Sequence, residues 1–448
     1  MRIGRKELFL YALPSLPYSL AYMPVVNFIP SFYSADLGVP LAVVGFAIFA
    51  TRLSDIVTDP VIGVMSDRTR SRFGRRKPFI AVGLPLLMLA VWMLFVPSQG
   101  MASGTYLLVW FLVLYLAYTL IDIPYRAWGA ELSTDYDDRS RVKAWRGAFE
   151  MCGTLTALAI ALGAGAAGYS GTANTMLALA LVFIVFQPVT FALTLMRLRE
   201  PPPEQLQIDE VPWRDKIKVF AKNGPMIRLS VGFTALMMSL VIAASLNLIF
   251  MSEVIGHPEA FALALFLQNV IGIAAVPFWL KLSERVGKHR AFAATVPLII
   301  AVCASFFLLG EGDVTWAVIL IALEGVGLGA WFFLAPAMLA DVVDLDKSQT
   351  GEERTGLYFS VFSMINKGGI ALGVLVGTSL PPLFGFEPSD PVHSEEALLG
   401  FRAVFSFAGA PLALLAFLVF WNYPVTRDVQ RALRAEIDGK RDRAVNPI

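Results

Sequence analysis

The chain has 448 residues, of which 56% are hydrophobic and only 16% are charged. An average soluble domain has roughly a quarter charged residues, so this chain lacks the polar surface that a soluble protein of its length needs. Its 36 lysine and arginine residues are matched by 35 aspartate and glutamate residues, which excludes a strongly basic nucleic-acid-binding protein. The two cysteines and three histidines are far apart in the sequence, so neither a disulfide framework nor a metal centre is expected.

Apolar runs near the length that crosses a bilayer, about 20 residues, recur along the chain. Glycine, proline and charge clusters separate these runs, which predict twelve membrane-spanning helices. The predicted centres of the first six are Met23, Val57, Leu86, Leu114, Ala157 and Ile184. Those of the last six are Leu240, Ile271, Ile299, Ala330, Leu372 and Leu414. The sequence therefore predicts an all-α polytopic membrane protein.

The longest polar segment lies between the sixth and seventh predicted spans, and we interpret it as a linker. The predicted domains are an N-terminal six-helix bundle at 1–197, a cytoplasmic linker at 198–225, a C-terminal six-helix bundle at 226–425 and a cytoplasmic tail at 426–448. A weak repeat supports two halves, because Asp67-Arg68 after the second span is echoed by Glu284-Arg285 after the eighth. Parallel six-helix repeats of this kind predict the major facilitator fold.

Lysine and arginine gather in alternate loops. The loop after the second span contains Arg68, Arg70, Arg72, Arg75, Arg76 and Lys77. Basic residues near the ends of spans stay on the cytoplasmic side, so both termini are predicted to be cytoplasmic, in agreement with an even number of spans. We expect a monomer in the plasma membrane, which for a bacterium is the inner membrane.

The same loop has a second feature, the pattern Gly63-x3-Asp67 with Arg75 downstream. This pattern is the loop signature of the major facilitator superfamily and predicts a gating loop. A cluster of charges that only sets topology is the alternative, and it explains the arginines but neither Gly63 nor Asp67.

Three charged residues lie inside the second span, namely Arg52, Asp55 and Asp59. A charge at mid-bilayer costs about 2.5 to 3.5 kcal/mol on insertion scales, so each needs a reason to be there. Spacings of three and four residues bring them to one helical face. Two carboxylates one turn apart can hold a monovalent cation or share a proton, and Thr119 in the fourth span can add a neutral oxygen. A purely structural Arg-Asp-Asp network is the alternative.

The fourth and fifth spans contain further charges at helical spacing. Asp122 and Arg126 are one turn apart, as are Arg146 and Glu150. For the second of these pairs, a simple intrahelical ion pair is an equally good interpretation.

The C-terminal half has one basic residue deep in a span, Lys367. A buried lysine needs a carboxylate partner, and we expect the aspartates of the second and fourth spans to supply it. Glu324 is a second candidate partner. The glycines beside it, Gly325, Gly327 and Gly329, favour a helix-contact role.

Together these residues resemble the glycoside-pentoside-hexuronide:cation symporter family. The matching pieces are Arg52-x-x-Asp55-x-x-x-Asp59-Pro60, the Arg70-Ser71-Arg72-Phe73-Gly74-Arg75 loop, Tyr118-Thr119-x-x-Asp122, Asp341-x-x-Asp344 and Lys367-Gly368-Gly369. They run in order from the second span to the eleventh, so the resemblance covers essentially the whole chain.

The resemblance implies roles for individual residues. Asp55, Asp59 and Thr119 would form the coupling-cation site, with Arg52 and Lys367 as charge partners near it. Asp122 and Arg146 would hydrogen-bond sugar hydroxyls. Trp331 or Phe332 lies where the family's cavity has an aromatic residue.

The departures from the family concern the substrate more than the cation. Tyr18-Ser19 stands where the best-known member has a Lys-Asp pair, and Arg126 stands where a tryptophan stacks on the sugar. Thr58 replaces a common asparagine, which leaves Na⁺ use open and makes H⁺ plausible. A cavity with Tyr18, Ser19, Arg126 and Trp331 suits an anionic sugar, a glycoside with an apolar aglycone, or an amphiphile.

The sequence thus predicts a cation-coupled secondary symporter, using Na⁺ or H⁺, that imports a sugar, glycoside or related organic solute by alternating access. The alternatives are a cation-coupled transporter of a lysolipid-like amphiphile, a proton-driven exporter, and a non-transporting membrane protein on the same scaffold. An enzyme is not expected, because no histidine cluster, nucleophile elbow or phosphate-binding loop is visible. The predicted partners are a small-molecule substrate, the coupling ion and the lipid bilayer, with no cofactor.

Overall fold

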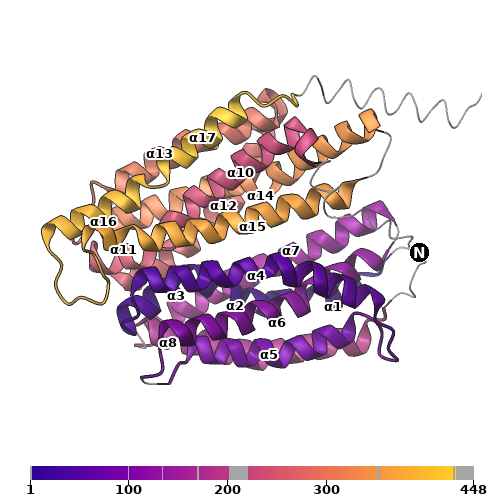
Figure 1. Ribbon diagram of the computed structural model, residues 1–448, viewed down its shortest axis with the longest axis horizontal. Coiled ribbons are helices and arrows are strands. Elements are labelled where there is room, and N and C mark those ends of the chain that lie inside the picture. The colour runs from indigo at the N-terminus through magenta and orange to yellow at the C-terminus, as the bar shows by residue number, and fades with distance from the viewer. Residues whose placement is uncertain are drawn as a thin grey trace, which may run out of the picture. The chain divides into compact units, whose positions relative to one another are not determined.

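The computed structural model describes residues 3–98, 100–133, 135–168, 171–200, 220–350, 354–426 and 429. This part of the chain is all-helical (Figure 1). It contains 12 helical segments that are long and apolar enough to cross a membrane, which confirms the predicted fold class and number of spans. Most of the predicted linker and of the predicted tail lies outside the described residues.

The chain packs into two compact units. The first comprises Met1–Gln207, Ala244–Phe266 and Val374–Phe401, and the second comprises Ile208–Ala243, Leu267–Gly373 and Arg402–Ile448. The division into six-helix halves at the linker stays a prediction.

The helices fall into two groups, one before the linker and one after it. Those before the linker are α1 (Arg5–Ala12), α2 (Ser15–Asn27), α3 (Ile29–Ser31), the π-helix η1 (Phe32–Asp36), α4 (Leu41–Arg68), α5 (Lys77–Phe95), α6 (Gly104–Glu131), α7 (Tyr136–Ala166) and α8 (Thr172–Arg197). Those after it are α10 (Gly224–Ala244), α11 (Asn247–Glu253), η2 (Pro258–Ala260), α12 (Phe261–Val286), α13 (Lys288–Phe306), α14 (Val314–Thr350), α15 (Thr355–Ser379), η3 (Pro381–Phe384), α16 (Glu395–Phe407) and α17 (Ala410–Trp421).

In the first unit α6 is the central packing element, with α4 and α5 against it, while α2 packs on α7. Close helix contacts need small residues in a membrane, where all helix surfaces are apolar. Gly153 of α7 is such a residue, since a Cβ there would clash with the carbonyl oxygen of Leu16. These contacts fix the faces of α4, α6 and α7 that contain the buried charges.

In the second unit α13 packs against α14 and α17, around a core that includes Phe292, Trp331 and Phe420. Helices α12 and α14 also contact each other, and glycines at the contact let the two backbones lie close together. A Cβ on Gly325 or Gly329 of α14 would clash with the carbonyl oxygen of Gln268 or Gly272 on α12. This contact therefore has very little freedom to shift.

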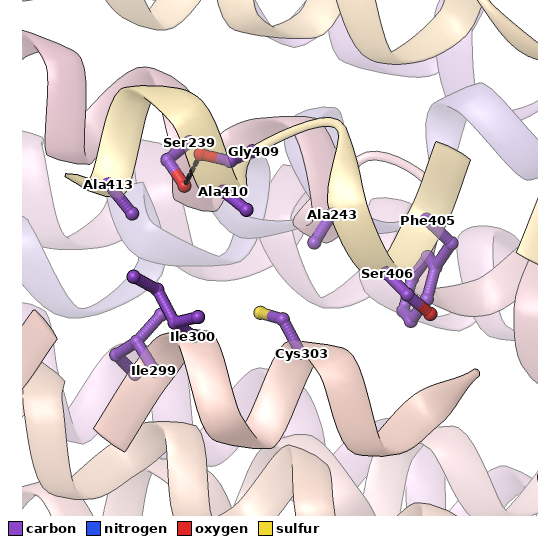
Figure 2. Close-up of a pocket in the computed structure, with 10 residues that line it drawn as sticks. All are labelled: Ser239, Ala243, Ile299, Ile300, Cys303, Phe405, Ser406, Gly409, Ala410 and Ala413. Atoms are coloured by element: carbon purple, nitrogen blue, oxygen red, sulfur yellow. Dashed lines mark hydrogen bonds between the residues drawn. The ribbon is translucent and has the colours of Figure 1, made fainter. Parts of the chain in front are cut away.

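A small, mainly apolar pocket lies among α10, α13, α16 and α17 (Figure 2). Its lining residues are Ser239, Ala243, Ile299, Ile300, Cys303, Phe405, Ser406, Gly409, Ala410 and Ala413. Ser239 donates a hydrogen bond to the carbonyl of Gly409 at 2.8 Å, which satisfies a backbone group where the last span is interrupted between α16 and α17. The described lining contains no charged side chain, so this pocket is not the predicted cation site.

Candidate cation and substrate site

Helix α4 turns Arg52 and Asp55 into the interior of the first unit. Asp55 is only 5% exposed, and its Oδ2 lies 3.4 Å from Nη1 of Arg52. The Arg52 guanidinium also lies over the Tyr115 ring, 4.2 Å from the centroid, and donates to the Tyr22 hydroxyl at 3.3 Å. A cation–π contact and an ion pair together hold this arginine inside the helix bundle.

One turn further along α4, Asp59 meets α6. The Thr119 hydroxyl donates to Asp59 Oδ1 at 3.0 Å, so the two helices bring a carboxylate and a neutral oxygen together. Carboxylate and hydroxyl oxygens are ligands for hard cations, and a carboxylate is also a proton acceptor. The donor set around Asp55, Asp59 and Thr119 therefore fits either Na⁺ or H⁺.

Asp122 of α6 forms a second cluster with α7. Its Oδ2 lies 2.6 Å from Arg126 Nε and its Oδ1 lies 2.7 Å from Arg146 Nη2. Arg146 Nε in turn lies 2.8 Å from a Glu150 carboxylate oxygen. The pairing of Arg146 with Glu150 within α7 is thus present, but Arg146 also reaches across to Asp122, which spacing along one helix could not reveal.

The two arginines of this cluster differ in exposure. Arg146 is 10% exposed, and its guanidinium lies over the Tyr125 ring at 5.1 Å from the centroid. Arg126 is 62% exposed. Arg146 therefore orients Asp122, while the guanidinium of Arg126 is accessible to a ligand.

Tyr18 and Ser19 of α2 lie at the edge of the same cluster. The Tyr18 ring packs edge-on against Tyr118 at 4.9 Å between centroids, and it lies within electrostatic range of Asp122. Ser19 donates to the carbonyl of Glu150 at 2.9 Å. The structure thus brings Tyr18, Ser19, Asp122, Arg126 and Arg146 together within the first unit, and their role in substrate binding stays a prediction.

The loop between α4 and α5 forms an ion-pair network with the end of α6. Arg76 is buried and pairs with both Asp67 and Glu131, whereas Arg75 pairs with Glu131 at 2.8 Å. Asp67 thus pairs with Arg76, and the role of Gly63, Asp67 and Arg75 as a gating loop stays a prediction. A Cβ at Gly63 would make only an ordinary contact, so this structure gives no steric reason for a glycine there.

Glu200, just after the end of α8, was not predicted from the sequence, and its side chain binds this loop. Its carboxylate accepts hydrogen bonds from the backbone N–H groups of Arg75 and Lys77, each at 2.7 Å, and from that of Arg76. An anion is favourable at the N-terminus of a helix, here α5. Gly74 has φ of +108°, and a Cβ there would lie 2.6 Å from the Glu200 carboxylate. Nothing in the local sequence signals a contact across more than a hundred residues.

Two predicted residues belong to the second unit. Lys367 lies half-buried in α15, and its pairing with the aspartates of the first unit stays a prediction. Trp331 is 3% exposed in the core of the second unit, where its indole N–H donates to Thr295 at 3.0 Å. This contact gives Trp331 a packing role, and its role in substrate binding also stays a prediction.

The chain matches the family model described as MFS/sugar transport protein over residues 10–427. The chain belongs to this family. It is 24% identical over 443 residues to the glucuronide carrier protein homolog of Escherichia coli (strain K12), covering 96% of this chain and 95% of that relative. It is 25% identical over 440 residues to a putative glycoside/cation symporter of the same strain, covering 95% and 93%. These matches confirm membership of the glycoside-pentoside-hexuronide:cation symporter family.

More distant likenesses agree with this assignment. The sodium-dependent lysophosphatidylcholine symporter 1 of Xenopus tropicalis is 23% identical over 470 residues, covering 94% of this chain and 87% of the relative. A nucleoside transporter, NupG, superposes with a TM-score of 0.65 at 15% identity, covering 94% of this chain and all of that chain. A D-xylose-proton symporter superposes with a TM-score of 0.68 at 11% identity, covering 93% and 97%. The major facilitator fold and a multi-pass membrane protein are thereby confirmed.

Proposed function

We propose that this chain is a cation-coupled symporter that imports an organic solute by alternating access. The observation that carries the proposal is the junction of α4 and α6, where Asp59 and Thr119 meet within one turn of Asp55. The names of the relatives, a glycoside/cation symporter and a sodium-dependent symporter among them, support the same function.

The chemistry of coupling follows from charge. Carboxylates one turn apart on α4 repel each other, and a cation or a proton bound between them removes that repulsion. Binding energy of the ion then favours the conformation in which both carboxylates face the same site. If the solute also binds best to that conformation, each ligand raises the affinity for the other.

For the solute, we propose an anionic molecule, such as a sugar that has a carboxylate. The exposed guanidinium of Arg126 offers donors in a fork that fits a carboxylate, and Asp122 and Arg146 can bind neighbouring hydroxyls. The glucuronide carrier among the relatives supports this choice. A lysolipid-like amphiphile, whose phosphate could pair with Arg126, is the second candidate, supported by the lysophosphatidylcholine symporter.

We further propose that the protein is a monomer in the plasma membrane, the inner membrane of a bacterium, with both termini in the cytoplasm. The basic loop between α4 and α5 supports this orientation. Alternating access would occur by movement of two six-helix halves about a midplane site.

Uptake into proteoliposomes tests these assignments. Methyl glucuronide, methyl glucoside and lysophosphatidylcholine are offered as labelled solutes under an imposed Na⁺ or H⁺ gradient. We expect gradient-driven accumulation of the glucuronide, lost in Asp59→Asn and retained in Glu284→Gln, which changes an exposed carboxylate of α12. Undiminished accumulation in Asp59→Asn would contradict the cation site.

The variant Arg126→Gln tests solute binding separately from cation binding. The side chain is exposed, so the protein should fold normally and lose about tenfold or more in affinity for the anionic solute. Equal binding of methyl glucuronide by the wild type and this variant would contradict the role of Arg126 without affecting the cation site.

A further inference from the structure

A second buried carboxyl group lies in the second unit, away from the residues discussed so far. Glu324 lies within the apolar span of α14 and is 7% exposed. Its Oε2 accepts a hydrogen bond from the side-chain amide of Gln268 on α12 at 2.9 Å. Among the described residues, no lysine, arginine or histidine forms an ion pair with it.

The surrounding backbone holds this pair in place. Gly325, next to Glu324, lies against the carbonyl of Gln268, and Gly329 lies against that of Gly272. Trp279 of α12 donates to the carbonyl of Val326 at 2.6 Å, which adds a third tie between α12 and α14. The two helices cannot separate here without losing these contacts, so the carboxyl and the amide stay face to face.

Two polar side chains lie near Glu324. The neutral Gln268 amide of α12 contacts it, and the Cys303 thiol of α13 lies close enough to interact with its charge. Cys303 also borders the apolar pocket of the second unit (Figure 2). None of these groups supplies a positive charge to an ionised carboxylate.

An ionised carboxylate at this depth is strongly unfavourable, and one neutral amide recovers only part of the lost hydration. A protonated carboxyl avoids this penalty. A carboxylic acid and a primary amide are also complementary, because the acid O–H can donate to the amide oxygen while the amide N–H donates to the acid carbonyl. We propose that Glu324 and Gln268 form a proton-binding site, which holds one proton at neutral pH and releases it in alkaline solution.

This site goes beyond the proposed symport function and does not depend on it. Release of the proton leaves a negative charge beside the carbonyl oxygens of the α12–α14 contact. A glutamate of the unfolded chain loses its proton already in mild acid, while the folded protein keeps this one. The stability that the site contributes is therefore complete in acid, falls as pH rises from mild acid up to the release, and is constant above it.

The experiment follows thermal stability of the purified full-length protein in nanodiscs from mildly acidic to alkaline pH. We expect the Tm of the wild type, relative to that of Glu324→Gln, to fall from mildly acidic pH up to the release and then to level off, since glutamine is a neutral mimic of the protonated acid. Glu284→Gln, the exposed control on α12, should follow the wild type. Gln268→Leu should move the end of this fall to lower pH, and a move to higher pH would show that the amide binds the carboxylate and overturn its part in holding the proton.

Infrared spectroscopy provides a readout that a merely structural glutamate would not change. At neutral pH, the difference spectrum between wild type and Glu324→Gln should contain the C=O stretch of a protonated carboxylic acid, and this band should disappear in alkaline solution. An absent band at neutral pH overturns the proposal. So does a Tm that changes with pH in the same way in wild type and Glu324→Gln, and an unshifted fall in Gln268→Leu overturns the part played by the amide.

Discussion

Helices α4 and α12 occupy corresponding places in the sequence repeat, but α4 contacts its neighbour through polar side chains and α12 contacts its neighbour through backbone. Asp67 and Glu284 are equivalent in the loop repeat, and counting back from each by the same number of residues pairs Asp55 of α4 with Gly272 of α12. In the first unit this stretch meets α6 through side chains, with a hydrogen bond from Thr119 to Asp59. In the second unit the backbone of Gly272 lies directly against α14. A Cβ on Gly272 would be 3.1 Å from the carbonyl oxygen of Gly325.

The difference separates a polar contact from a close-packed one. Polar side chains between α4 and α6 make the first contact depend on charge. Direct backbone contact between α12 and α14 makes the second depend on shape. Equivalent helices of the repeat are therefore joined by polar side chains in one unit and by closely packed backbone in the other.

The loops that follow these helices remain alike. In the first unit Arg76 binds Glu131 near the end of α6 at 2.7 Å. In the second unit Lys288 binds Asp341 of α14, with its Nζ 2.7 Å from one carboxylate oxygen. In both units, a basic residue at the start of one helix is paired with an acidic residue of the next helix. The two units therefore share this ion pair, although the buried Asp55 of α4 corresponds to a glycine in α12.

The largest effect is expected from removing a buried charge from the first unit, at the contact between α6 and α7. Arg146→Met leaves Asp122 and Glu150 facing each other with Arg126 as the nearby cation, and Arg146 itself is buried. Breaking a buried pair costs about 3 to 5 kcal/mol, and we expect a loss near the lower figure because Asp122 keeps one partner. Thermal unfolding in detergent measures it, with Arg126→Gln as the exposed control. A loss of stability no greater than that of the control would contradict the structural role of Arg146.

A smaller effect is expected from adding one methyl group to the close-packed contact. Gly325→Ala places a Cβ against the Gln268 carbonyl oxygen, and overpacking costs about 1 to 3 kcal/mol. Gly63→Ala is the matched change on α4, where the nearest atom, on Ile123, is 3.8 Å away. We expect the first variant to unfold at a clearly lower temperature and the second to stay near the wild type. Equal Tm values for the two variants would show that the α12–α14 contact can relax.

The next effect concerns the loop of the first unit. Glu200→Gln keeps the shape of the side chain and removes the charge that interacts with three backbone N–H groups at the start of α5. Loss of a helix-terminal anion costs about 1 kcal/mol. We expect a modest fall in Tm and easier proteolysis of the loop between α4 and α5. Unchanged proteolysis would mean that the ion pairs of Arg75 and Arg76 alone hold this loop.

The smallest effect is expected for the corresponding loop of the second unit. Lys288→Met removes the ion pair with Asp341, but the lysine is partly exposed, so the loss should be at most about 1 kcal/mol. Chemical denaturation of wild type and variant under the same conditions measures the difference. A larger loss than in Glu200→Gln would reverse the order of the two loops.

Much of the candidate site could be predicted because its residues lie along single helices. Arg52, Asp55 and Asp59 repeat at helical spacing in an apolar span, and the cost of charges in lipid marks them as functional or paired. Asp122 and Arg126 are equally visible, and their ion pair is present at 2.6 Å. Contacts between helices were harder to predict, because the Arg146–Asp122 and Glu200–Lys77 contacts join residues on different helices whose rotation no local pattern specifies.

The sequence by itself determined the twelve spans, the family and the identity of the buried charges, because hydropathy and the cost of charge in a bilayer act on each segment separately. Only the tertiary structure decided that Arg76 binds Asp67, that Trp331 is in a packed core, and that Glu324 faces a neutral amide. The rotation and register of each helix settle these pairings, and both depend on how side chains and glycines of neighbouring helices pack.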